Sequence, residues 1–178
     1  MNKKAIVQLL IYARGNTLSD NEKVPNRTHL QKEMFLLQKE TSFSEYELYD
    51  FVPYYYGPFS RNLDSDVVEL AGSGNIDDSD GFLLTHKGFA EADKMWKSLR
   101  DAERRALIRI KEKYNNLSSD DLLKYVYSRY RKYTMKSALP PDNLFAYFDS
   151  FSDSNDITVD YLDSALNRIR HPADESGH

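Results

Sequence analysis

The sequence contains no cysteine, which excludes disulfide bonds, thiolate zinc sites and cysteine nucleophiles. It also has no apolar run approaching the ~20 residues needed to cross a bilayer, and its first residues turn polar too soon for a signal peptide. We therefore expect a cytoplasmic protein with no membrane anchor. The 178 residues suffice for one core with a helical extension.

The sequence also lacks the usual motifs of catalysis. It has no Gly-x-Ser-x-Gly elbow, P-loop or Rossmann fingerprint, and its histidines are scattered. His29 and Glu33 lie one helical turn apart and could hold a metal together, but no further ligands show metal-site spacing, so we expect an exposed pair. Asp77, Asp78 and Asp80 are expected to be solvated in a polar turn. We therefore expect no catalytic residue, no metal and no cofactor, and hence no enzyme.

Aromatic residues are abundant, at 13% of the chain, with 13 Tyr and 9 Phe. Tyrosine combines a large ring with a hydroxyl that needs a partner, so it suits half-buried faces and interfaces. The segment from Tyr46 to Tyr56 predicts an extended strand that enters the core, with Gly57 and Pro58 ending it as a turn. Alternation along a strand leaves at least one of its three consecutive tyrosines near the surface.

Residues 1–86 have the element order of a winged helix-turn-helix. Apolar spacing and capping residues predict helices over three segments, about 6–13, 28–40 and 60–71. Ile76 and residues 82–84 flank a polar turn and predict a β-hairpin, the candidate wing. The fold class is therefore α+β, mainly helical, with a winged-helix-type unit. A generic α+β unit with the same elements is the alternative.

Residues 87–170 predict a helical extension. Its first part, 87–114, is expected to be one long helix that packs across the first unit or pairs with a second copy through Leu99, Ala106 and Ile110. A tyrosine-rich helix from Ser118 or Ser119 and two shorter helices, beginning near Asn143 and Thr158, complete it. The tail, 171–178, is expected to be disordered.

The net charge of −4 conceals three blocks. Residues 1–93 carry −6, residues 94–136 carry +8 and residues 137–178 carry −6. The blocks either neutralise one another, within the fold or across a dimer, or the basic segment 94–136 offers a strip for a phosphate backbone. The third helix and the hairpin, which face DNA in many winged helices, are acidic and would repel it.

Binding of nucleic acid would therefore depend on the basic segment 94–136. The candidate residues are Arg104, Arg105, Arg109, Lys111, Arg129, Arg131 and Lys132. Tyr127, Tyr130 and Tyr133 interleave with the second group and could stack on bases. A solvated helix face is the simpler interpretation of these charges.

Several short motifs resemble the YwgA-type family of uncharacterised prokaryotic proteins. They are LQKEMFLL at 30–37, YYGPFS at 55–60, LLTHKG at 83–88 and LKYVYSRY at 123–130. The first half is also similar, more weakly, to the Panacea domain, whose pattern is a Leu-Gln-Lys helix followed by a Gly-Pro turn. The Panacea resemblance implies an antitoxin module that neutralises toxins by protein contact. The YwgA resemblance implies a fold but no activity.

Together these observations predict a non-catalytic binding module that acts by protein–protein contact, antitoxin-like or adaptor-like, on a toxin or another basic protein. Its candidate contact residues are Tyr54, Tyr55, Tyr56 and Arg61. The alternative is a winged-helix DNA-binding transcriptional regulator that uses segment 94–136 and dimerises through helix 87–114. An enzyme centred on His29 and Glu33 is a third possibility.

Overall fold

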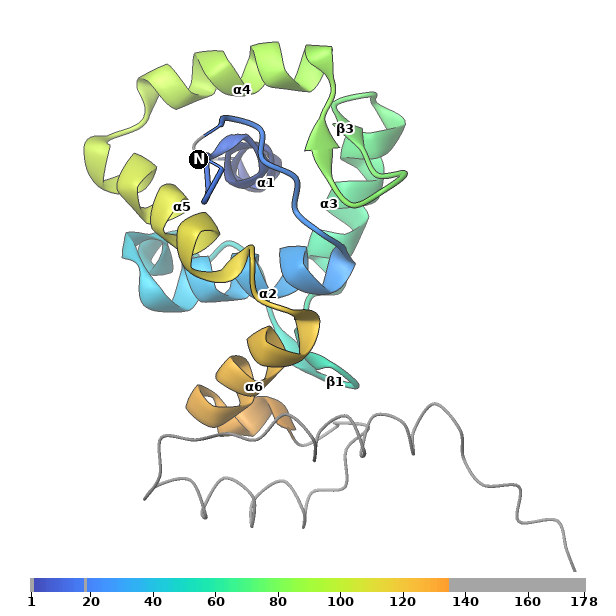
Figure 1. Cartoon of the computed structure of the whole chain (residues 1–178), viewed down its shortest axis with the longest axis vertical. Coiled ribbons are helices and arrows are strands. Elements are labelled where there is room, and N and C mark those ends of the chain that lie inside the picture. The colour runs from blue at the N-terminus through green and yellow to red at the C-terminus, as the bar shows by residue number, and fades with distance from the viewer. Residues whose placement is uncertain (1, 18, 135–178) are drawn as a thin grey trace, which may run out of the picture.

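A computed structural model describes residues 2–17 and 19–134 and shows a mainly helical fold with two small β-hairpins. Helix α1 (Lys3–Tyr12) lies at the centre of the helices and is seen end-on in Figure 1. All residues from Ile6 to Ala13 are buried, because a nearly unbroken apolar run leaves this helix no polar face. The predicted helices beyond residue 142 and the tail 171–178 lie outside the described residues.

The helices that surround α1 in Figure 1 are α2 (Arg27–Glu40), α3 (Arg61–Gly72), α4 (His86–Ser98) and α5 (Asp101–Tyr114). Three of them begin at a polar cap. Asn26, Ser60 and Thr85 each accept a hydrogen bond from the backbone N–H three residues later, at 3.0, 3.4 and 3.1 Å. Such caps satisfy an amide group that has no partner inside the helix. The predicted first three helices are confirmed.

The predicted hairpin after α3 is also confirmed. Strands β3 (Ile76–Asp77) and β4 (Leu83–Leu84) are antiparallel, with Ile76 opposite Leu84. Val24, in the loop before α2, pairs with Phe82 through two backbone hydrogen bonds of 3.0 and 2.9 Å. The start of α4 comes so close to this hairpin that a Cβ on Gly88 would lie 2.0 Å from the carbonyl oxygen of Asn75. Only glycine fits at that position.

The single strand predicted over 46–56 is wrong. The chain first forms the short 3₁₀ helix η1 (Ser42–Tyr46) and then a hairpin of β1 (Val52–Tyr54) and β2 (Gly57–Phe59). Tyr55 and Tyr56 form the turn, and Gly57 and Pro58 belong to the second strand. Pro53 pairs with Pro58, which is possible because each strand of a two-stranded sheet is an edge strand.

The single helix predicted over 87–114 is also wrong. Leu99 and Arg100 are extended, with ψ of 147° and 151°, and separate α4 from α5. Glu103 stabilises the new start, because its carboxylate accepts hydrogen bonds from the Arg100 backbone N–H and guanidinium, both at 2.9 Å. Leu99, Ala106 and Ile110 are buried inside this one chain. Their stripe is therefore not available for pairing with a second copy.

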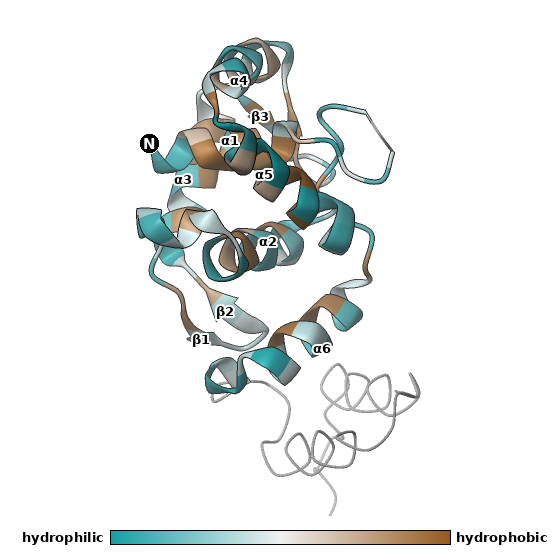
Figure 2. Cartoon of the chain, turned by 90° about the vertical axis from the view of Figure 1, so that its left-hand side faces the viewer, coloured by the Kyte–Doolittle hydropathy of each residue, from teal (hydrophilic) through white to brown (hydrophobic). Residues whose placement is uncertain are grey.

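Helix α2 lies between two layers of the structure, as Figure 2 shows. Helices α1 and α5 lie on one side of it. The hairpin β1–β2 and the helices α6 (Ser119–Arg129) and η2 (Arg131–Thr134) lie on the other. The predicted tyrosine-rich helix is thus confirmed as α6, and Ser118 caps it. Residues 29–37 of α2 are all buried, including Gln31, Lys32 and Glu33, because both faces of the helix are covered.

Candidate functional site

The hairpin β1–β2 presents the largest exposed aromatic surface in the described part of the chain. Tyr54, Tyr55 and Tyr56 are 46%, 57% and 49% exposed, and Val52 is 53% exposed. The rings order one another, since Tyr54 packs against Tyr55 with 4.9 Å between centroids and stacks on Phe59 at 5.0 Å. We call Val52, Tyr54, Tyr55, Tyr56 and Phe59 the aromatic hairpin. All three tyrosines reach the surface, more than the one that strand alternation requires.

The aromatic hairpin is firmly anchored on α2. Gln31 exchanges two hydrogen bonds with the backbone of Ser60, at 3.0 and 2.9 Å. The Nζ of Lys32 donates to the carbonyl oxygen of Pro58 at 3.3 Å. Burial lowers the pKa of Lys32 to about 7, because no carboxylate compensates for the lost water. A surface held in this way loses little conformational entropy when it binds.

The charges beside the aromatic hairpin are mostly positive. Arg61 is exposed at the start of α3, directly after β2 and Ser60. Helix η2 packs against β1 and carries the exposed residues Arg131 and Lys132. Asp50, just before β1, is an exposed carboxylate on the same segment. Arg61 is therefore the first residue of α3, but the turn expected beside it at Gly57 and Pro58 is part of β2.

The acidic groups of α3 are largely paired within the chain. Asp66 accepts a hydrogen bond from the Tyr49 hydroxyl at 2.7 Å, and Lys4 pairs with Glu69. Asp64 lies 3.3 Å from the guanidinium of Arg27. The negative charge that led us to expect a basic partner is therefore reduced by the fold itself.

The basic candidates for nucleic-acid binding do not form one strip. Lys111 is fully buried, and its Nζ donates to the carbonyl oxygens of Ile11, at 3.4 Å, and Glu22. It cannot contact a phosphate backbone, so the prediction for this residue is wrong. The sequence suggested that Lys111 lies on a solvated helix face, because the segment around it is rich in charged residues. In the structure, the helical twist of α5 places its side chain in the core.

The other candidates lie on different parts of the fold. Arg104 is occupied by the Trp96 carbonyl oxygen at 3.0 Å and by Asp101. Arg105 and Arg109 are exposed on α5, whereas Arg129, Arg131 and Lys132 belong to α6 and η2. Helix α2 lies between these two groups (Figure 2). Tyr127 and Tyr133 are 2% and 4% exposed, and rings so buried cannot serve as stacking platforms for bases.

The pair of His29 and Glu33 is buried, contrary to our expectation of an exposed pair. The Nε2 of His29 lies 2.9 Å from the carbonyl oxygen of Leu117, and its Nδ1 lies 3.2 Å from Asn26 Oδ1. Within residues 2–17 and 19–134, no group of three or more His, Cys, Asp or Glu side chains is placed to hold a metal ion. His29 therefore has the ordinary contacts of a core residue.

Glu33 belongs instead to a buried polar centre between α1, α2 and α5. Both of its carboxylate oxygens are buried without a hydrogen-bond partner, and burial raises its pKa to about 8. Burial likewise lowers the pKa of Lys111 to about 8, although Glu33 and Glu22 oppose that shift. Asn115 donates to Glu22 at 3.0 Å. This centre is enclosed, so it has no access for a substrate.

A second carboxylate, Glu40, joins three helices at the end of α2. It accepts hydrogen bonds from the hydroxyls of Tyr114, Tyr125 and Tyr130 at 2.6, 2.7 and 3.1 Å. Burial alone would raise the pKa of Glu40, but the tyrosine hydrogen bonds outweigh it and the pKa falls below its usual value. Every oxygen in this cluster is engaged by the fold, so we assign it a structural role.

None of the helices in the described part of the chain has the length and apolar content needed to span a lipid bilayer. No protein-family model matches the chain, and no curated protein matches it either.

Proposed function

We propose that the protein is a non-catalytic, cytoplasmic binding module that recognises a protein partner through the aromatic hairpin, as an antitoxin or an adaptor would. The observation that carries this proposal is the exposure of Tyr54, Tyr55 and Tyr56 on an anchored hairpin. Tyrosine is enriched among the residues that dominate binding energy at interfaces. The similarity of residues 1–86 to the Panacea domain favours an antitoxin within this class.

The proposal includes a winged-helix-type arrangement for residues 1–86. Three features support it: the order of α1, α2 and α3, the hairpin β3–β4 that follows, and the bridge that adds Val24 to Phe82 beside that hairpin. In such an arrangement α3 is the element that enters a DNA groove. The carboxylates of α3 and the burial of Lys111 favour a protein partner over the DNA-binding alternative.

Replacement of the tyrosines tests the proposal. A triple variant with Tyr54→Ser, Tyr55→Ser and Tyr56→Ser removes most of the exposed ring area and leaves the core intact. Wild-type and variant proteins would be tagged, expressed in the native host and purified with their partners under mild cross-linking. We expect one protein to copurify with the wild type and to be lost with the triple variant, because three anchor rings are gone.

The matched control is Phe89→Ser, which removes an exposed ring from α4, away from the aromatic hairpin. Phe89 also packs on Tyr12 at 5.1 Å between ring centroids, so this variant should melt at a somewhat lower temperature but should still retain the partner. Equal recovery of the partner by the triple variant would contradict the hairpin assignment. Recovery of nucleic acid without any protein would contradict the proposed function as a whole.

A further inference from the structure

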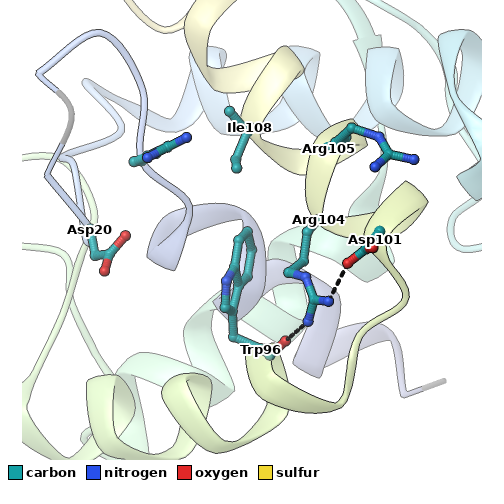
Figure 3. Close-up of a pocket in the computed structure, with 7 residues that line it drawn as sticks. Asp20, Trp96, Asp101, Arg104, Arg105 and Ile108 are labelled. Carbon is teal, nitrogen blue, oxygen red and sulfur yellow. Dashed lines mark hydrogen bonds and ion pairs between the residues drawn. The ribbon is translucent and has the colours of Figure 1, made fainter.

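A hollow of about 310 Å³ lies where the end of α1, the end of α4 and the start of α5 meet. Figure 3 shows its residues, with Trp96 and Ile108 as its apolar side chains and Arg104 and Arg105 on α5. Arg14, just after α1, also lines it. The volume is at the lower end of the ~300–1,000 Å³ of small-molecule sites.

A second hollow of about 760 Å³ adjoins the first. The two share Arg14, Arg105 and Ile108, and the second adds Arg109. Arg105 and Arg109 are one helical turn apart, so their side chains lie on the same face of α5. A ligand could therefore extend from the aromatic wall of the first hollow into the arginine-lined second one.

Three of the arginines in these hollows are available to a ligand. Arg104 is occupied by the carbonyl oxygen of Trp96 and by Asp101, which hold its guanidinium in place. Arg14, Arg105 and Arg109 are exposed, and none of them forms a close ion pair with a described carboxylate, although Arg105 adds to the effect of Arg104 in lowering the pKa of Asp101. Like charges one turn apart repel each other unless an anion lies between them.

The carboxylates of the hollows leave a positive balance. Asp101 is paired with Arg104 at 2.5 Å. Glu40 is engaged by the tyrosine hydroxyls and lies 3.4 Å from Arg129. Among the described residues, the lining as a whole carries four arginines and four carboxylates. Because Asp101 and Glu40 are engaged by other groups, Arg14, Arg105 and Arg109 face Asp20 and Glu112. This excess of one positive charge favours an anion.

We propose that the two hollows form a binding site for a small phosphorylated ligand of the nucleotide class. The phosphates lie among Arg14, Arg105 and Arg109, because guanidinium groups bind phosphate oxygens in a bidentate manner. The base lies against Trp96 and Ile108, because an indole ring stacks on a planar base. Tyr12 supports the indole at 5.3 Å between centroids. This site is separate from the aromatic hairpin and adds a second ligand to the proposed function.

Trp96 provides a direct test, because it is the only tryptophan in the chain and its fluorescence therefore reports on this site alone. The full-length protein would be titrated with ATP, GTP and inorganic tripolyphosphate at low ionic strength, with calorimetry as a second measurement. We expect a saturable change in Trp96 emission with a nucleotide, and weaker binding of tripolyphosphate, which lacks a base.

Variants assign the residues. Arg105→Glu with Arg109→Glu should weaken nucleotide binding by about tenfold or more, because two phosphate contacts are lost and charge repulsion is gained. Lys94→Glu, at an exposed basic residue of α4 outside the hollows, is the matched control and should bind like the wild type. Arg105, Arg109 and Lys94 are all exposed, so these proteins should keep their fold.

The proposal fails if neither nucleotide binds at concentrations up to about 1 mM, a weak affinity for such a site. It also fails if the Arg105→Glu, Arg109→Glu double variant binds as the wild type does. If tripolyphosphate binds as tightly as the nucleotides and Trp96→Leu changes nothing, the site takes only an inorganic anion. That outcome would overturn the assignment of the base-binding wall.

Discussion

At the scale of single residues, Glu33 shows what the fold does to a buried carboxyl group. No part of its side chain is exposed, neither oxygen has a hydrogen-bond partner, and its pKa rises to about 8. A carboxylate is costly to bury unless it is paired, so burial favours the protonated form of Glu33, whereas the nearby Lys111 favours the charged form. In the unfolded chain its pKa returns to 4.5.

The pH dependence of stability should therefore change when Glu33 is replaced by Gln. Because the folded pKa lies above the unfolded value, the contribution of Glu33 to stability is complete below about pH 4.5 and is lost as the pH rises to about 8. A glutamine cannot ionise. Relative to wild type, Glu33→Gln should gain roughly 1–3 kcal/mol of unfolding free energy between about pH 5 and about pH 8.

Urea unfolding at several pH values measures this difference. Comparing the two proteins at each pH cancels the contributions of groups that do not interact with Glu33, such as His29, whose pKa burial lowers. The difference includes the change at Lys111, whose pKa Glu33 raises. Glu45→Gln, at an exposed position in η1, should show no change with pH. A difference between Glu33→Gln and wild type that stays constant with pH would contradict a raised pKa.

Replacement of Lys111 should destabilise the fold rather than weaken a nucleic-acid contact. Lys111→Met keeps the length of the side chain but removes the donor to the carbonyl oxygens of Ile11 and Glu22. We expect a loss of roughly 2–4 kcal/mol, because two buried acceptors lose their partner and Glu22 loses a nearby positive charge. Arg109→Met, on the exposed side of the same helix, should cost less than about 0.5 kcal/mol. Thermal melts of the two variants give the comparison.

At the scale of elements, Glu40 adds a polar attachment to α6, whose Leu122 and Val126 are buried in the core. Its hydrogen bonds to Tyr125 and Tyr130 join the end of α2 to α6, and its bond to Tyr114 adds α5. Hydrogen bonds to a charged acceptor are stronger than neutral ones. The polar part of this attachment therefore depends on a single carboxylate.

Glu40→Gln should loosen α6 selectively. The neutral amide accepts the tyrosine hydroxyls more weakly and places a donor among them, so we expect a loss of roughly 1–2 kcal/mol. Hydrogen–deuterium exchange should show faster exchange in residues 119–129, while α3 keeps its protection. Exchange that accelerates equally in both helices would argue against a local role. Glu112→Gln, an exposed carboxylate on α5, is the matched control.

The sequence predicts most of the helices but neither the break between α4 and α5 nor the way the helices pack. Helical spacing and caps such as Ser60 depend on neighbouring residues, so they are visible in the chain. The break before Asp101 was missed because the apolar stripe continues through Leu99 and because Arg100 is not a usual N-cap. The acidic residues Asp101 and Glu103 in the first turn were the available signal.

The candidate site was predicted in part. Strand alternation placed a tyrosine of 54–56 at the surface, although the paired hairpin that exposes all three was not foreseen. The burial of Lys32 and Glu33 could not be predicted from the sequence. Both residues are buried because other elements pack against both faces of α2, and these long-range contacts leave no local pattern. Arg14 and Trp96 meet only because α1 and α4 pack together, a long-range contact with no local pattern.

At the scale of the whole molecule, the burial of the expected dimer stripe affects the assembly state. Leu99, Ala106 and Ile110 are 6%, 8% and 2% exposed, so a second copy cannot use them while the chain stays folded. We expect light scattering on the purified protein to give the monomer mass of 20.7 kDa. A dimer that forms only with the wild type would use the aromatic hairpin, which is an exposed apolar surface. A dimer mass that persists in the triple variant of Tyr54, Tyr55 and Tyr56 would contradict the expected monomer, because that surface has been removed.

The buried polar centre also determines when the amino-terminal half can mature on the ribosome. The end of α1 and the loop that follows it have several polar contacts with residues far along the chain, since Lys111 donates to the carbonyl oxygens of Ile11 and Glu22 and Asn115 donates to the Glu22 side chain. Such contacts form late, because the intervening chain must first be closed into a loop. A nascent chain therefore cannot complete these contacts, and leaves the loop more open to chaperones and proteases, until residue 115 has left the exit tunnel.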